Sequence, residues 1–145
     1  MIRWAIEDDR PDILTLLHTT HDNAQEYNYK DFAGTVLVYR QGTRLIGFIA
    51  FTLGRPETWI RHISVAPAYQ NKGFVAKHLM AGVIKLALAH GSQGLEEFQT
   101  DKRAYLQEMS SRTGAVLQPG VRVRWPLTQE ASPKAQRLKR DLLKV

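Results

Sequence analysis

The chain has 145 residues, of which 43% are hydrophobic and 23% charged, and it contains no cysteine. These proportions are ordinary for a globular protein, and the length suits one domain with a single core. The missing cysteines exclude disulfides, thiolate catalysis and Cys-ligated zinc, and the cytoplasm is the default location. We expect neither a membrane span nor a signal peptide, since no apolar run is long enough. The net charge of +6 favours an anionic ligand or nucleic acid.

The N-terminal part predicts a strand followed by a helix. Residues 2–6 alternate apolar and polar side chains, as an edge strand does. Asp8 and Asp9 are then expected to cap a helix that has Pro11 in its first turn. Residues 19–34 are polar and show no clear period, which is typical of a surface loop.

Three strands are predicted next. Residues 35–40 and 44–53 form two of them, joined by a compact turn at 41–43. The second of these is apolar on both faces, which favours a central position in the sheet. Residues 59–66 are rich in β-branched and aromatic side chains and stop at Pro67, as a strand would.

A long helix is predicted from Gly73, where the apolar period changes to that of a helix. Its expected buried stripe is Ala76, Leu79, Met80, Val83, Ile84 and Ala87. His90 and Gly91 supply the last turn and the glycine that follows it. The loop at 67–72 includes Lys72, and no acidic residue lies from 64 to 89. A helix start of this kind is suited to binding phosphate.

The C-terminal part predicts a short strand at 95–100, a helix to about 113, and a hairpin of 115–118 with 121–127. Residues 131–145 then form a basic helical tail that starts at Ser132 and Pro133. The tail is interpreted first as a solvated helix docked by its leucines. The alternative is that it binds nucleic acid or another acidic partner.

The segment from Val65 to Val75 resembles the acyl-CoA-binding signature of the GNAT superfamily of N-acetyltransferases. That signature is an Arg or Gln, two residues, Gly, one residue, and Gly or Ala, after a strand that ends in Val-x-Pro. Gln70 and Gly73 match it, and Val75 stands where the family has Gly or Ala. A weaker resemblance extends over residues 2–127.

This resemblance implies an α/β GNAT-like fold, with a central mixed, twisted sheet of six to seven strands and helices on both faces. It implies one acyltransferase domain at 1–130, followed by the tail at 131–145. In such a fold the fourth and fifth strands splay apart, and pantetheine pairs with the backbone of the fourth strand. The implied cofactor is acetyl-CoA or another acyl-CoA. The implied cofactor-binding residues are Ile63, Ser64, Val65, Gln70, Asn71, Lys72, Gly73, Phe74 and Val75.

Val75 leaves two alternatives open. Its methyl groups either crowd the pyrophosphate or pack under the helix, where alanine would leave a void. We favour the first alternative, because Val75 lies off the expected apolar stripe.

The implied reaction transfers acetyl to a primary amine by direct attack in a ternary complex, which needs a base and an acid for the thiolate. His62 and Glu57 are the candidate bases, although a strand histidine is more often structural. The family's acid is a tyrosine four residues before the glycine that ends the last helix, and that position is Ser110 here. Tyr105 and water are the other candidate acids. The substrate-facing loop of the family corresponds to residues 19–34, whose aromatic side chains are Tyr27, Tyr29 and Phe32.

Two further functions compete with this hypothesis. One is a catalytically weakened GNAT-fold protein that binds CoA or a macromolecule, and the other is a basic protein associated with nucleic acid. The histidines, of which His18 and His21 are three residues apart, lack carboxylate or cysteine partners at ligand spacing, so we expect no metal. The acceptor amine is not identified by the sequence, and a homodimer is left open.

Overall fold

The structure is a computed structural model that describes residues 1–20, 35–72, 74–98, 116–118, 122–128 and 132–145. Several predicted site residues lie outside these ranges, namely Tyr27, Tyr29, Phe32, Gly73, Tyr105 and Ser110. The helix expected after residue 100 lies outside them as well.

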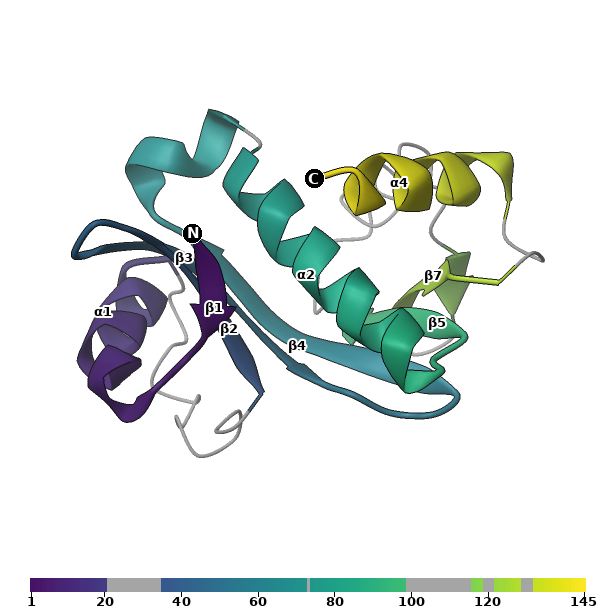
Figure 1. The fold of residues 1–145 in the computed structure, drawn as a ribbon, viewed down its shortest axis with the longest axis horizontal. Helices are drawn as coiled ribbons and strands as arrows, with labels where there is room; N and C mark the ends of the chain where they lie inside the picture. Colours follow the sequence, from purple (N-terminus) through teal and green to yellow (C-terminus); the bar gives the residue numbers. More distant parts are fainter. Residues whose placement is uncertain (21–34, 73, 99–115, 119–121, 129–131) are drawn as a thin grey trace. The chain divides into compact units, whose positions relative to one another are not determined.

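Seven strands form one sheet, hydrogen-bonded in the order β1-β2-β3-β4-β5-β7-β6 (Figure 1). The elements in chain order are β1 (Ile2–Trp4), η1 (Glu7–Asp9), α1 (Arg10–Thr20), β2 (Val36–Gln41), β3 (Arg44–Thr52), β4 (Glu57–Val65), η4 (Pro67–Lys72), α2 (Phe74–His90), β5 (Gly94–Phe98), β6 (Val116–Gln118), β7 (Arg122–Pro126) and α4 (Pro133–Leu143). β4 pairs with β5 in parallel, whereas β2 pairs with β1 and β3, and β7 with β5 and β6, in antiparallel fashion. The predicted mixed sheet of six to seven strands is therefore confirmed.

The chain divides into two compact units. Unit 1 contains residues 1–51 and 61–82, and unit 2 contains residues 52–60 and 83–145. The first unit therefore holds β1, β2, most of β3, the end of β4 and the start of α2. The second unit holds the start of β4, the end of α2, and the elements that follow α2.

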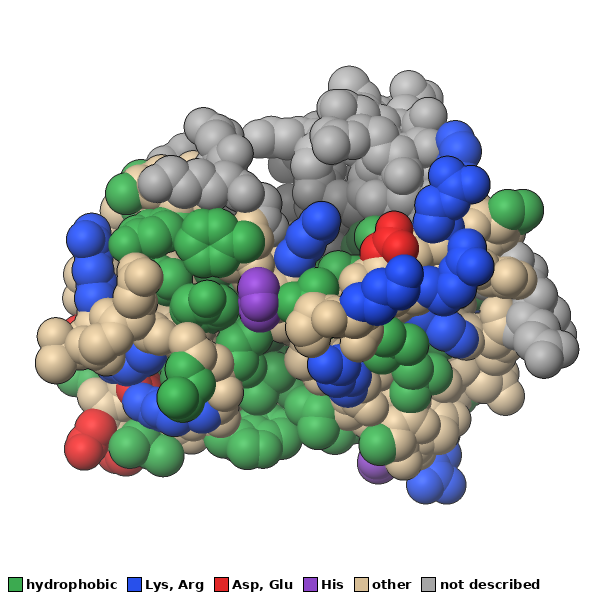
Figure 2. Space-filling model, turned by 45° about the horizontal axis from the view of Figure 1, so that its top comes forward, with side chains coloured by type: hydrophobic (Ala, Val, Ile, Leu, Met, Phe, Trp, Pro, Cys, Tyr) green, Lys and Arg blue, Asp and Glu red, His purple; other side chains and the backbone are tan. Residues whose placement is uncertain are grey.

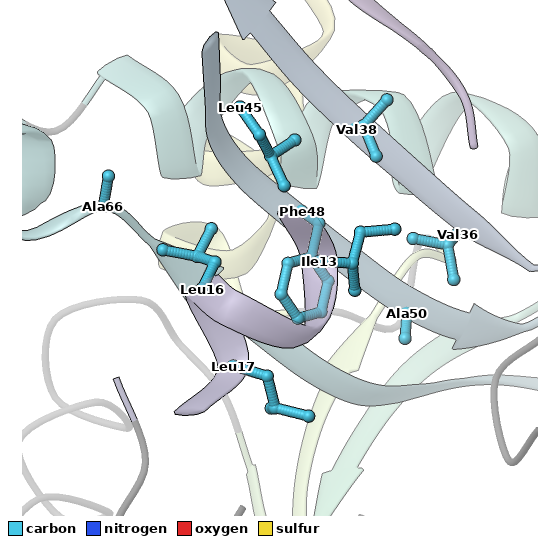
Figure 3. Close-up of a cluster of buried hydrophobic side chains, with 9 residues drawn as sticks. All are labelled: Ile13, Leu16, Leu17, Val36, Val38, Leu45, Phe48, Ala50 and Ala66. Carbon is cyan, nitrogen blue, oxygen red and sulfur yellow. The ribbon is translucent and has the colours of Figure 1, made fainter. Parts of the chain in front are cut away.

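Unit 1 has helices on both faces of its strands. Side chains of α1 pack with one face of β2 and β3, in a buried cluster of Ile13, Leu16, Leu17, Val36, Val38, Leu45, Phe48, Ala50 and Ala66 (Figure 3). Val75 and Leu79 of α2 lie against Gly47, next to Phe48 in the same strand. Since neighbouring strand residues point to opposite faces, α1 and α2 cover different sides.

The first turn before α1 differs from its predicted form. Asp8 is exposed, and the 3₁₀ turn Glu7–Asp9 precedes the helix. The Asp9 carboxylate accepts a hydrogen bond from the Ile6 N–H at 2.8 Å. It is also ion-paired with Arg3 and Arg40 at 2.7 and 2.8 Å. The expected capping role is therefore confirmed for Asp9, whose carboxylate accepts the N–H of the N-cap residue Ile6. Asp9 is 1% exposed and is also the centre of a buried ionic cluster.

The hairpin and the long helix follow the prediction closely. Gly42, with a φ of 63°, lies in the turn between β2 and β3, and the register pairs Gln41 with Arg44. β3 is buried over nearly its whole length, as a central strand should be. α2 ends at His90, and Gly91 follows with a φ of 87°, as expected of a glycine after a helix.

In unit 2, hydrogen bonds connect the start of β4 to the residues that precede β5. The Ser92 hydroxyl bonds to Thr58 Oγ1 at 2.7 Å and donates to the Gly54 carbonyl at 2.6 Å. The register aligns Thr58 with Leu95, and Leu95 with Trp125, and all three of these side chains are buried. A row of buried side chains therefore runs across the parallel pairing of β4 with β5.

Candidate functional site

The sequence predicts an anion site at the junction between β4 and α2. The chain leaves β4 at Val65, passes through η4 (Pro67–Lys72) and enters α2 at Phe74. The expected loop at 67–72 is therefore a 3₁₀ helix. No acidic residue occurs in the sequence from 64 to 89. The first N–H groups of a helix have no partner within that helix, and the helix dipole adds a partial positive charge there. The junction is therefore suited to a phosphate group.

Hydrogen bonds hold this junction against the end of the sheet. The Gln70 side-chain amide donates to the Val65 carbonyl at 3.0 Å. The Ala66 N–H donates to the Ile46 carbonyl at 2.8 Å, which joins the end of β4 to β3. Gln70 is one of the implied cofactor-binding residues, and one of its two amide protons is used for this bond to Val65. Its observed role is to hold η4 in shape.

An aromatic cluster braces the first turn of α2. The Phe74 ring lies edge-on to Tyr39 and to Tyr69, with a centroid distance of 6.1 Å in each case. The Tyr69 hydroxyl donates to Gln41 Oε1 at 2.9 Å, which ties η4 to the hairpin. His78 Nδ1 lies 2.7 Å from the Phe74 carbonyl oxygen, and its ring packs on Tyr39. The Phe74 ring is therefore a packing element.

Val75 is a core residue, and this overturns the alternative favoured from the sequence. Its side chain is 0% exposed. A Cβ added to Gly47 would lie 2.7 Å from Val75 Cγ1 and 3.1 Å from the Ser64 carbonyl oxygen. The buried stripe of α2 starts at Val75 and Leu79, whereas Ala76 and Met80 are only half-buried. The valine methyl groups therefore pack under the helix, and they are no obstacle to a ligand at its start.

His62 and Ser64 lie on the buried face of β4. His62 is 7% exposed and stacks on Phe48, with ring centroids 5.9 Å apart. Ser64 Oγ lies 3.0 Å from Thr20 Oγ1, and Thr20 Oγ1 donates to the Leu16 carbonyl at 2.9 Å. A hydroxyl has a single proton, so Ser64 must be the donor of the Ser64–Thr20 bond. The lone pairs of Ser64 can then accept a further hydrogen bond on this face.

Glu57, the second candidate base, is engaged in an ion pair. Arg124 donates from both Nε and Nη2 to Glu57 Oε1, at 2.9 and 2.7 Å. Arg124 Nε also lies 4.0 Å from Glu96 Oε1. These two charge-assisted bonds to Arg124 favour a structural role for Glu57.

The backbone of β4 that the resemblance assigns to pantetheine lies beyond the parallel register. That register runs from Glu57–Gly94 to Ile60–Glu97, and β4 continues to Val65. The side chains of Ile63 and Val65 are half-buried.

Within the described ranges, no group of three or more His, Cys, Asp or Glu side chains could hold a metal ion. None of the described helices is long and apolar enough to cross a membrane.

A family model described as the Acetyltransferase (GNAT) family matches residues 2–107. No curated protein matches the chain. Among solved structures, the ribosomal-protein-S18-alanine N-acetyltransferase from Escherichia coli is similar with a TM-score of 0.68 and 17% identity, over 92% of this chain and 96% of that one.

Two similar structures contain coenzyme A. The GNAT family N-acetyltransferase YhbS from Escherichia coli, in complex with CoA, has a TM-score of 0.68 and 18% identity, over 90% of this chain and 82% of that one. The N-acetylglutamate synthase from Neisseria gonorrhoeae, complexed with coenzyme A and N-acetyl-glutamate, has a TM-score of 0.62 and 22% identity. In that case the match covers 74% of this chain and only 27% of the synthase. At these identities the similarities establish the fold.

Proposed function

Because the chain belongs to the GNAT acetyltransferase family, we propose that it transfers the acetyl group of acetyl-CoA to a primary amine by direct attack in a ternary complex. The observation that carries this proposal is the braced, acid-free junction between η4 and α2. We treat residues 1–130 as the acyltransferase domain.

The proposed cofactor site uses the end of β4, η4 and the first turn of α2. The N–H groups of that turn would bind the pyrophosphate, and the β4 backbone near Ile63 and Val65 would pair with pantetheine. The nine residues proposed from the sequence are retained, with the Phe74 and Val75 side chains reassigned to packing. Two proteins of similar fold contain CoA in their structures, which supports this choice of cofactor.

The chemistry requires one bond to form and one to break. The neutral amine nitrogen attacks the acetyl carbon, the carbon–sulfur bond breaks, and CoA leaves as a thiolate. The nitrogen loses a proton, and the thiolate gains one. We propose His62 as the base because Glu57 is already paired with Arg124. Ser110, Tyr105 and water remain the proposed acids, and Tyr27, Tyr29 and Phe32 the proposed acceptor contacts.

The experiment that tests this function measures thiol release from acetyl-CoA in the presence of a panel of primary amines and peptides. We expect at least one amine to raise the rate, and His62→Gln to lower kcat/KM by about 100-fold. The dissociation constant of acetyl-CoA should stay unchanged in this variant. Arg61→Gln, a change at the exposed neighbouring position of β4, is the matched control and should retain the rate.

Two outcomes would contradict the proposal. Tight acetyl-CoA binding without thiol release for any acceptor would favour the catalytically weakened CoA-binding protein. Full activity of His62→Gln would remove His62 as the base. The cytoplasm as location and a homodimer as assembly are further proposals, which rest on the sequence alone.

A further inference from the structure

Most of the chain's net charge lies in the C-terminal segment that contains α4. Residues 132–145, which include α4 (Pro133–Leu143), contain five Lys and Arg residues and one Asp. They therefore carry +4 of the net +6. A surface helix more often mixes charges of both signs, which support one another three or four residues apart.

The other face of α4 is anchored in unit 2. Ser132 caps the helix by accepting a hydrogen bond from the Ala135 N–H at 3.2 Å. Ala135 and Leu142 are each 4% exposed. Lys139, which lies toward this side of the helix, donates to the Leu127 carbonyl at 3.0 Å. These contacts fix which face of α4 meets the solvent.

The solvent-facing side carries a basic stripe, which is interrupted by Asp141. Its exposed cations are Lys134, Arg137, Arg140 and Lys144, spaced three, three and four residues apart. This spacing places them on one helix face, over about 15 Å at 1.5 Å per residue. Exposed Asp141 is the one acidic side chain of the helix, and it lies on this same face, four residues after Arg137 and three before Lys144. Figure 2 shows Lys and Arg side chains gathered on the side of the view where Figure 1 draws α4.

Four cations and one acid lie on this face, so repulsion between cations prevails, and a polyanion laid along the row would relieve it. The sequence of α4 contains no aromatic residue, so the helix has no platform on which unpaired bases could stack. Lys and Arg alone suit contacts to a phosphate backbone, which needs no base reading. These properties favour a duplex over a single strand.

We propose that the α4 stripe binds the phosphate backbone of a nucleic-acid duplex without regard to base sequence. The four exposed cations contact phosphates and release the counterions condensed on them. Sequence-independent binding of this kind has dissociation constants of about 10⁻⁴–10⁻⁶ M at physiological salt. Four phosphate contacts correspond to a slope of about −3.6 in log K against log salt for B-form DNA.

The test titrates the full chain into a labelled DNA duplex at several salt concentrations and follows fluorescence anisotropy. In Arg137→Gln/Arg140→Gln/Lys144→Gln, we expect at least about a tenfold loss of affinity at low salt, and the slope should fall to about −0.9. The matched control is Arg10→Gln/Arg44→Gln/Lys77→Gln, which removes the same charge from exposed positions in unit 1. This control should stay within about threefold of the unchanged protein.

An RNA duplex of the same sequence should bind with similar affinity, because it offers the same backbone chemistry. Equal loss in the two triple variants would overturn the proposal, because net charge alone would then explain binding. Tighter binding of single strands, or equal competition by polyglutamate, would overturn it in favour of base stacking or an acidic protein. Absence of duplex binding at low salt would also overturn it. The α4 variant should keep its thermal shift with acetyl-CoA, which verifies that the protein is folded.

Discussion

Replacing Asp9 by asparagine is expected to lower the free energy of unfolding by about 3 kcal/mol at pH 7. Asp9 is buried and accepts hydrogen bonds from Arg3 at 2.7 and 2.9 Å, from Arg40 at 2.9 Å and from the Ile6 N–H at 2.8 Å. Asparagine keeps the shape but removes the charge that balances two guanidinium groups. This loss of unfolding free energy is at the low end of what removing one partner of a buried ion pair costs, because Arg3 is partly exposed and can be hydrated again.

The Asp9 cluster also sets a pH dependence. Hydrogen bonds from Arg3, helped by those from Ile6 and Arg40, hold the pKa of Asp9 well below its usual range. The unfolded chain binds a proton at Asp9 near pH 3.9, and the folded chain only at lower pH. The stabilisation is therefore complete above about pH 5, and it is lost as the pH falls through the folded pKa.

Urea unfolding of both proteins across this range checks the prediction. The gap between the unchanged protein and Asp9→Asn should be constant from pH 7 to about pH 5 and should narrow below about pH 4. The matched control is Asp8→Asn, since Asp8 is an exposed neighbour. A gap that stays constant into strong acid, or an equal effect of the control, would show that the charge of Asp9 does not stabilise the fold.

Replacing Gly47 by alanine is expected to cost about 2 kcal/mol of stability and to weaken acetyl-CoA binding. The new Cβ would lie 2.7 Å from Val75 Cγ1, 3.1 Å from the Ser64 carbonyl oxygen and 3.2 Å from Leu79 Cδ1. One of these neighbours is strand backbone, which cannot move without disturbing β4. The close contacts of the new Cβ can therefore be relieved only if the start of α2 shifts. The start of α2 is the proposed phosphate site.

Gly82→Ala is the matched control for Gly47→Ala. A Cβ at Gly82 would lie 2.9 Å from Leu37 Cδ1, the end of a flexible side chain. Alanine is also the better helix former by about 1 kcal/mol, which offsets the contact. Thermal unfolding should therefore leave Gly82→Ala within about 1 kcal/mol of the unchanged protein. If Gly47→Ala is as stable as Gly82→Ala and binds acetyl-CoA equally well, the close packing of α2 on β3 is not required for the site.

Features encoded by neighbouring residues were predictable from the sequence. The apolar period and the glycine after His90 predicted where the long helix ends, and Gly91 has the positive φ expected there. The unbroken apolar run of β3 predicted a central strand, which the burial pattern confirms. Ser132 before Pro133 predicted the start of α4, and the cap is observed. Each of these depends on chemistry within a few positions of the chain.

Features that depend on distant residues were not predictable. Asp9 pairs with Arg40, which is 31 positions away in the sequence, and no local sequence pattern predicts that pairing. Val75 was misassigned because its side chain in α2 packs against Gly47, which lies far away in sequence on β3. Two signals were present, however. Val75, Leu79 and Val83 recur every four residues, and a lone glycine inside an apolar strand often marks a close approach.

Acetyl-CoA is proposed to bind where η4 meets α2, and calorimetric titration of Gly73→Glu with acetyl-CoA measures whether it does. Glutamate adds both a side chain and a negative charge at the proposed phosphate site. Ala89→Glu is the control, because it places the same charge at an exposed position near the other end of α2. We expect Ala89→Glu to bind acetyl-CoA like the unchanged protein, and Gly73→Glu to give no binding heat at an unchanged melting temperature. Equal affinity of Gly73→Glu and Ala89→Glu would contradict the proposal.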